Sequence, residues 1–243
     1  MARMKKSTRL LFVAVVLAAV MFAWGIFVGH YHVWPFSVLH GLKVSAVGTR
    51  PEAQPWPPAW TPSELWSMSD ERFRAIRGDF DVVMLGDSLT NGGRWSELLN
   101  RIVANRGIGG DTTTGVLARL DEVSGRHPRV VLVMLGINDL MGSRSVDEIV
   151  RNYRLIITGL QEAGATVIVQ STLLPGAQLN DLADPVRSLN AALQSMAIDL
   201  GVAFIDLNAK MAPDGVLLDT TDGIHLTGAG YATWAAAIRD AVQ

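Results

Sequence analysis

The 243-residue chain contains no cysteine, which excludes disulfide bonds, thiolate metal sites and a cysteine nucleophile. It also lacks a long basic run. Its 21 lysines and arginines are offset by 23 aspartates and glutamates, which gives a formal net charge of -2. Nucleic acid is not expected as a partner, since its phosphates require clustered Lys and Arg. No H-E-x-x-H motif or comparable ligand cluster occurs, so neither a metal nor another cofactor is expected. Any nucleophile must therefore be an oxygen or an amine.

Charged residues are absent from residues 10–29, an apolar run long enough to cross a hydrocarbon core of roughly 30 Å as a helix. Lysines and arginines precede this run, and the next one follows only at Lys43. The positive-inside rule therefore puts the N-terminus in the cytoplasm. We predict a transmembrane signal anchor within residues 1–29 and, after it, a domain held at the cell membrane outside the cytoplasm. A cleaved signal peptide, which would secrete the domain, is the alternative, but no clear A-x-A site closes the run.

Residues 30–60 show neither helical nor strand periodicity and contain five prolines and three tryptophans. We predict a semi-extended linker in this segment. Order resumes at Thr61, which together with Pro62 and Glu64 has the pattern of a capping box that begins a helix. The chain thus divides into an anchor (1–29), a linker (30–60) and a folded domain (61–243).

Within residues 61–243, apolar runs rich in β-branched residues alternate with segments of helical periodicity. The runs span residues 80–85, 102–105, 130–135, 166–170 and 202–205. This alternation predicts a parallel sheet covered by helices on both faces, a doubly wound α/β/α sandwich. Ligands of such sheets bind beyond the carboxyl ends of the strands, so the residues after each strand are the candidates for chemistry.

The first of these segments, Gly86-Asp87-Ser88-Leu89-Thr90, puts a serine hydroxyl at a strand-to-helix turn. Ser88 is a candidate nucleophile there, although a serine at this position can also act only as a helix N-cap. The segment lacks the G-x-S-x-G pattern, so the α/β-hydrolase fold is not indicated.

Two further segments carry hydrogen-bond donors. The glycine-rich bend at 105–113 follows the second strand, and its backbone N–H groups can point at an anion. A dinucleotide site is the alternative, but Thr112 stands where the third glycine of G-x-G-x-x-G belongs. After the third strand, Asn138 in Gly136-Ile137-Asn138-Asp139 can donate to a developing oxyanion. The alternative is that Asn138 or Asp139 forms an Asx-turn or caps a helix.

Near the C-terminus, the segment Asp222-Gly223-Ile224-His225-Leu226 precedes the last predicted helix. Histidine is the side chain best suited to take a serine proton near neutral pH. A carboxylate three residues earlier in a turn can reach the imidazole Nδ1 and fix its tautomer, as the third member of a triad does. Taken alone, the segment would be assigned to an ordinary turn.

In this order, the four segments resemble the four motif blocks of the SGNH (GDSL-type) hydrolases, and the resemblance runs from about Thr61 to the end. The stretch 70–113 is similar to the branch of platelet-activating-factor acetylhydrolase catalytic subunits. The resemblance implies a flavodoxin-like three-layer α/β/α sandwich with a five-stranded parallel sheet. It implies a catalytic triad of Ser88, Asp222 and His225. It also implies an oxyanion hole of the Ser88 amide, the Gly110 amide (with Gly109 as the nearby alternative) and the Asn138 side chain.

These implications describe a serine esterase that hydrolyses carboxylic esters, short-chain and acetyl-type by analogy with the acetylhydrolase branch, through an acyl-enzyme on Ser88. Its expected partners are a small-molecule, glycan or lipid ester and, through the N-terminal helix, the membrane. Two alternatives use the same chain differently. One is an extracytoplasmic O-acyltransferase that delivers the acyl group to a sugar hydroxyl, and the other is an anchored binding module that has lost activity.

Overall fold

The computed structural model describes residues 61–243, and the predicted anchor and linker lie outside the described residues. Five strands form one parallel sheet in the order β2-β1-β3-β4-β5. The predicted five-stranded parallel sheet is thereby confirmed. Every strand begins within two residues of the first residue of its predicted run. The strands are β1 (Val82–Gly86), β2 (Ala104–Gly107), β3 (Val130–Met134), β4 (Thr166–Gln170) and β5 (Ala203–Ile205). In residues 61–243 no helix has the length and apolar character needed to cross a bilayer.

A side-chain N-cap marks the start of five of the helices named below. The first helix begins later than the sequence pattern predicts, because Ser63 rather than Thr61 caps it by accepting a hydrogen bond from the Trp66 amide. Trp66 is the buried residue of this helix, so the helix starts where its buried face starts. The helices are α3 (Glu64–Ala75), α4 (Ser88–Asn91), α5 (Trp95–Leu99), α6 (Thr113–Ala118), α7 (Leu120–Ser124), α8 (Ile137–Met141), α9 (Val146–Glu162), α10 (Ala183–Leu200), α11 (Asn208–Met211) and α12 (Gly228–Ile238), with 3-10 turns η1 (Ala177–Leu182) and η2 (Arg239–Val242).

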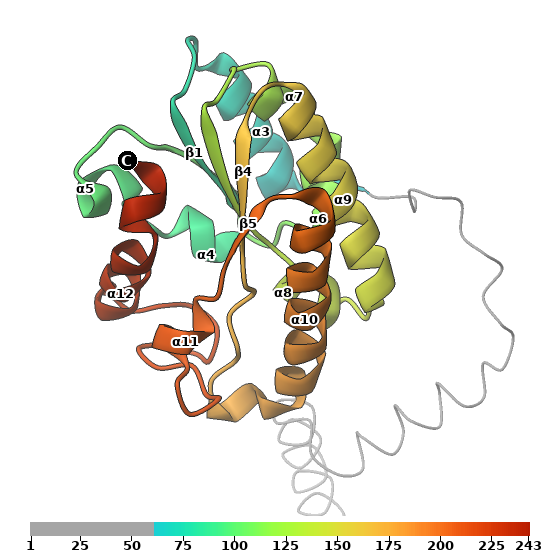
Figure 1. Ribbon diagram of the computed structural model, residues 1–243, viewed down its shortest axis with the longest axis vertical. Coiled ribbons are helices and arrows are strands. Elements are labelled where there is room, and N and C mark those ends of the chain that lie inside the picture. The colour runs from blue at the N-terminus through green and yellow to red at the C-terminus, as the bar shows by residue number, and fades with distance from the viewer. Residues whose placement is uncertain (1–60) are drawn as a thin grey trace, which may run out of the picture. The chain divides into compact units, whose positions relative to one another are not determined.

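Helices cover both faces of the sheet because successive strand residues point to opposite sides. Met84 and Leu132 belong to an apolar cluster shared with residues of α5 and α12. Val83 and Val133 belong to a second cluster shared with α9 and α10. Figure 1 shows α5 and α12 on one side of the strands and α9 and α10 on the other. The two clusters account for the predicted three-layer sandwich.

The chain order reverses at β1, which lies between β2 and β3. Gly86, the last residue of β1, pairs in register with Gly107 of β2 and Met134 of β3. The loops after these three strands therefore leave the sheet side by side. This is the switch point at which a doubly wound sheet binds its ligands.

Candidate active site

Ser88, His225 and Asp222 lie in hydrogen-bonding contact at the switch point. Ser88 Oγ is 3.0 Å from His225 Nε2, and Asp222 Oδ2 is 2.7 Å from Nδ1 of the same ring. Ser88 is the first residue of α4, directly after β1, whereas His225 lies in the loop before Thr227, the N-cap of α12. The fold thus brings together a hydroxyl and an imidazole that are 137 positions apart in the chain.

Asp87, not Ser88, caps α4, because its Oδ1 accepts a hydrogen bond from the Leu89 amide at 3.0 Å. The alternative in which Ser88 serves only as a cap is therefore wrong, and its hydroxyl is left to contact His225. The Asp87 side chain is buried, and its Oδ2 has no hydrogen-bond partner among the described residues. Burial raises the pKa of Asp87 to about 7. The carboxyl group adjoining the candidate nucleophile is consequently partly protonated near neutral pH.

Two glycines let the backbone close tightly around Ser88. A side chain at Gly86 would collide with the Met134 carbonyl and with Thr90. A side chain at Gly107 would collide with the backbone of Asn91 at the end of α4. Because the ends of β1 and β2 lie this close to α4, the turn that carries the Ser88 hydroxyl has little freedom to move.

The loop that carries His225 is organised by Asp222. Asp222 Oδ1 accepts hydrogen bonds from the amides of Ile224 and His225, at 3.0 and 2.8 Å. The His225 carbonyl accepts a further bond from the Thr221 amide at 2.9 Å. The side-chain hydrogen bond with His225 is the main cause that lowers the pKa of Asp222 to about 2. Asp222 is therefore ionised at neutral pH and accepts the Nδ1–H, which leaves Nε2 to accept the Ser88 proton.

The glycine bend between β2 and α6 carries backbone donors without partners. The Ile108 amide donates to the Gly86 carbonyl at 3.1 Å, which holds the bend beside the turn that leads to the nucleophile. Within residues 61–243, the amides of Ser88, Gly109 and Gly110 donate no hydrogen bond. Gly110 has a φ of 74°, a left-handed conformation that glycine adopts at little cost. Both glycine amides are therefore available to an anion.

Asn138 lies in the first turn of α8, next to this bend. Its Nδ2 donates to the Asp111 carbonyl at 2.9 Å, and the second amide hydrogen is left for another acceptor. The side chain does not cap a turn, since the N-cap of α8 is Gly136, with a φ of 119° and no side-chain capping bond. Asn138 therefore does not cap α8, and Asp139 accepts instead from the amide and the hydroxyl of Thr113, at 3.0 and 2.7 Å.

A buried ion pair, which the sequence reasoning missed, ties the bend to the sheet. Arg119 donates from Nε and Nη2 to Asp111 Oδ2 at 3.0 and 2.8 Å, and both side chains are 0% exposed. Nη2 also donates to the carbonyl of Arg106 in β2 at 2.8 Å. Burial raises the pKa of Asp111, and the bonds from Arg119 oppose that rise. The one sign of this ion pair in the sequence is Arg119 itself, a charged residue among the apolar residues of 116–120.

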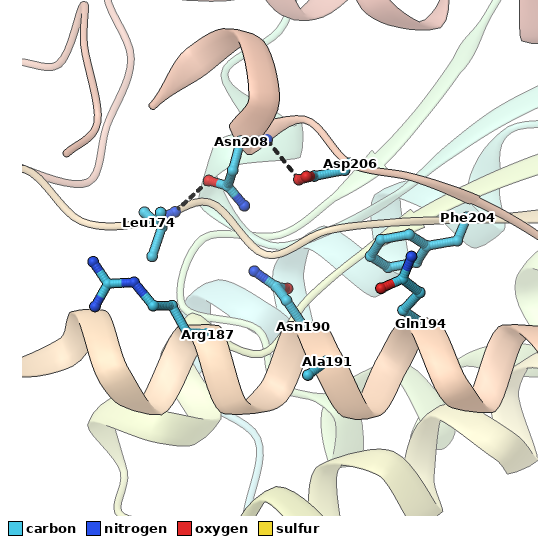
Figure 2. A pocket seen from close by; sticks show the side chains of 8 residues that line it. All are labelled: Leu174, Arg187, Asn190, Ala191, Gln194, Phe204, Asp206 and Asn208. Carbon is cyan, nitrogen blue, oxygen red and sulfur yellow. Dashed lines mark hydrogen bonds between the residues drawn. The ribbon is translucent and has the colours of Figure 1, made fainter. Parts of the chain in front are cut away.

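A cavity of about 380 Å³ lies between α5, α12 and Gly92 at the end of α4, and no triad residue lines it. A second cavity of about 290 Å³ lies between α10, β5 and the loop after it, and Figure 2 shows it from close by. None of the triad residues lines the second cavity, and its Asn190 and Asn208 are bonded to the backbone of Thr172 and Leu174. The described part of the chain has no cluster of three His, Cys, Asp or Glu residues that could hold a metal ion.

Comparison with known proteins matches the chain to one family. The model of the GDSL-like lipase/acylhydrolase family matches residues 84–233. The platelet-activating factor acetylhydrolase IB subunit alpha2 of Rattus norvegicus is 32% identical over 165 residues, which cover 63% of this chain and 71% of that protein. The alpha1 subunit of the same organism is 29% identical over 204 residues, which cover 77% of this chain and 87% of that subunit.

Solved structures share the fold. A GDSL-like lipase from Bacteroides thetaiotaomicron superposes with a TM-score of 0.64 at 24% identity, over 73% of this chain and 96% of its own. An acetyl xylan esterase superposes with a TM-score of 0.60 at 23% identity, over 67% of this chain and 99% of its own. The chain therefore belongs to the GDSL-like lipase/acylhydrolase family and is a serine hydrolase that acts on ester bonds.

Proposed function

We propose that the chain hydrolyses carboxylic esters of short acyl groups through an acyl-enzyme on Ser88. The observation that carries this proposal is the hydrogen-bonded series from Asp222 through His225 to Ser88. His225 Nε2 takes the hydroxyl proton as Oγ bonds to the acyl carbon, and the same proton passes to the alcohol oxygen as the ester C–O bond breaks. Water then attacks the acyl-enzyme in the same way and releases the acid. Asp222 stays ionised throughout and stabilises the imidazolium.

The negative charge that develops on the carbonyl oxygen requires donors near Ser88. We assign this role to the Ser88 amide, the Gly110 amide and the Asn138 side chain, with the Gly109 amide as the neighbouring alternative. The unpartnered N–H groups of this set support the assignment. Such donors act mainly in the transition state, so they raise kcat more than they tighten substrate binding.

Replacing Asn138 with alanine should lower kcat for p-nitrophenyl acetate by about 10²- to 10³-fold and leave KM nearly unchanged. The reason is that the lost N–H stabilises charge that exists only in the transition state. Steady-state kinetics measure both constants. The matched control is Asn180→Ala at an exposed position in η1, which should leave both unchanged. A rise in KM with an unaltered kcat would show that Asn138 binds substrate and does not hold the oxyanion.

The proposed preference for a short acyl group rests on the apolar packing next to the triad. Leu89 follows Ser88, Ile137 precedes Asn138, and Ile224 precedes His225. These three side chains pack with neighbouring leucines without leaving a water-sized space between them. An extended acyl chain could enter this packing only by displacing these side chains. The names of the acetylhydrolase relatives and of the acetyl xylan esterase neighbour support the same choice.

A series of p-nitrophenyl esters from acetate to dodecanoate tests the activity and the acyl preference of the full-length chain. We expect kcat/KM to be highest for the acetate and to fall by at least about tenfold at the octanoate, because each methylene that does not fit costs binding energy. Rates that rise with chain length would contradict the short-acyl proposal. An acylated glycan formed in place of free acid, when an acceptor sugar is supplied, would identify acyl transfer instead of hydrolysis.

The place of action stays a prediction drawn from residues 1–29. If that segment anchors the chain with its N-terminus in the cytoplasm, the hydrolase domain faces outward. O-acetylated glycans or lipids of the cell envelope would then lie within its reach.

A further inference from the structure

Asp87 is a buried carboxyl group beside the nucleophile that the proposed reaction does not use. The residue is 1% exposed, and its Oδ1 accepts a hydrogen bond from the Leu89 amide at 3.0 Å. Thr90 Oγ1, on the same helical turn, is also buried and, like Asp87 Oδ2, has no partner within residues 61–243. In the described part of the chain the carboxyl group therefore has a single donor. One donor is too few to stabilise a negative charge that is shielded from water.

Two neighbouring buried carboxyl groups have more donors than Asp87. Asp111 accepts from Nε and Nη2 of Arg119 at 3.0 and 2.8 Å. Asp139 accepts from the amide and the hydroxyl of Thr113 at 3.0 and 2.7 Å. Burial is the main cause that raises the pKa of Asp87 to about 7, and the negative charges of Asp111 and Asp139 raise it further. Asp87 is therefore the carboxyl group of the three that holds a proton most readily.

Further titratable groups interact with Asp87 from α9, from α12 and from the loop before α12. Tyr153 and Tyr231 stay neutral beside it, because burial raises the pKa of both hydroxyls, that of Tyr231 to about 12. His225 favours the ionised form of Asp87 when its ring is protonated. The charge that this ring gains during the reaction is already balanced by Asp222, at 2.7 Å. An ionised Asp87 is therefore not needed to stabilise the imidazolium.

The charge of Asp87 matters because of where the oxyanion forms. Asp87 and Ser88 share one peptide bond, and the N–H of that bond is a donor proposed for the oxyanion. An ionised carboxyl group would bring a negative charge next to the place where a second negative charge develops. Charges interact more strongly in a buried site than in water, so this repulsion would oppose the transition state. A neutral carboxyl group leaves the donor at full strength.

We propose that Asp87 is a positioning residue that supports the reaction in its neutral form, and that its ionisation slows the attack of Ser88 on the ester. Asp87 does not touch the substrate, and it acts through the Ser88 amide. The proposal rests on the proposed esterase activity and gives that activity an alkaline limit. With rising pH, kcat/KM should pass through a maximum and then fall as Asp87 loses its proton to solvent.

The test is the pH dependence of kcat/KM for p-nitrophenyl acetate, measured on the full-length chain and on Asp87→Asn from about pH 5 to about pH 9. Asparagine caps helices as well as aspartate does and has the shape of a neutral carboxyl group, so the variant fixes the neutral state. We expect kcat/KM of the unaltered chain to fall by about tenfold between about pH 7 and about pH 9, and Asp87→Asn to show no such fall.

The matched control is Asp184→Asn in the first turn of α10. Its carboxyl group is 92% exposed, so its removal should leave the alkaline fall as it is in the unaltered chain. An alkaline fall that persists in Asp87→Asn with the same midpoint would overturn the proposal. A variant that is inactive at every pH, or that does not fold, would overturn it as well, because the ionised carboxylate would then be required.

Chemical denaturation provides a measurement that needs no activity. The pKa of Asp87 is raised from its ordinary value of 3.8, so its proton stabilises the folded chain at low pH, and this contribution is lost as the pH rises through about 7. Relative to the unaltered chain, Asp87→Asn should therefore become more stable as the pH rises from about 4 to about 8. A difference that is the same at every pH would exclude a proton on Asp87. Failure of the unaltered chain to hydrolyse any ester would instead overturn the esterase activity, so the two failures are distinguishable.

Discussion

Replacing Ser88 with alanine should lower kcat for p-nitrophenyl acetate by about 10⁶-fold, the scale of loss known when a serine hydrolase is deprived of its nucleophile. Without Oγ no acyl-enzyme can form, and His225 has no hydroxyl proton to take. The side-chain contact of Ser88 in the structure is with His225, so the fold should not suffer. Thermal unfolding of the variant should therefore match that of the unaltered chain.

Covalent labelling with a fluorophosphonate provides a second measurement of the same prediction, because this probe attaches to an activated serine. Labelling should disappear in Ser88→Ala and persist in Ser67→Ala, a control at an exposed serine of α3. Labelling that persists in Ser88→Ala would assign the nucleophile to another residue. The triad would then have to be abandoned, whatever the distances between its members.

Replacing Arg119 with leucine should lower the free energy of unfolding by about 3–5 kcal/mol. The variant leaves Asp111 buried without its cation and removes the donor to the Arg106 carbonyl, while the cost of burying Asp111 stays. The glycine bend then loses its attachment to β2. Chemical denaturation of the purified variants measures the effect.

The control for Arg119 is Arg154→Leu. Arg154 pairs with Asp199 at 2.6 Å, but the two side chains are 41% and 55% exposed. Solvent screening makes such a pair worth at most about 1 kcal/mol. Similar losses in the two variants would mean that burial does not distinguish these ion pairs and that Arg119 is not a support of the bend.

The sequence was informative where the controlling interactions are local. Apolar runs rich in β-branched residues predicted all five strands, because strand formation depends on neighbouring side chains and turns. The cap of the first helix was misplaced by two residues, since both Thr61 and Ser63 can cap and burial of Trp66 favoured the second. The role of Arg119 could not be predicted, because its partners lie in β2 and in the bend and their burial is a property of the assembled fold.

By itself, the sequence determined the order of strands and helices, the family, and the residue types available for ester chemistry at the strand ends. Only the tertiary structure decided which atoms meet: that Asp87 caps α4 while Ser88 contacts His225, that Asn138 lies against the glycine bend, and that room remains beside α12. The physical reason is that periodicity and turn chemistry act over a few residues. Contacts between groups more than a hundred positions apart depend on how complete layers pack against each other.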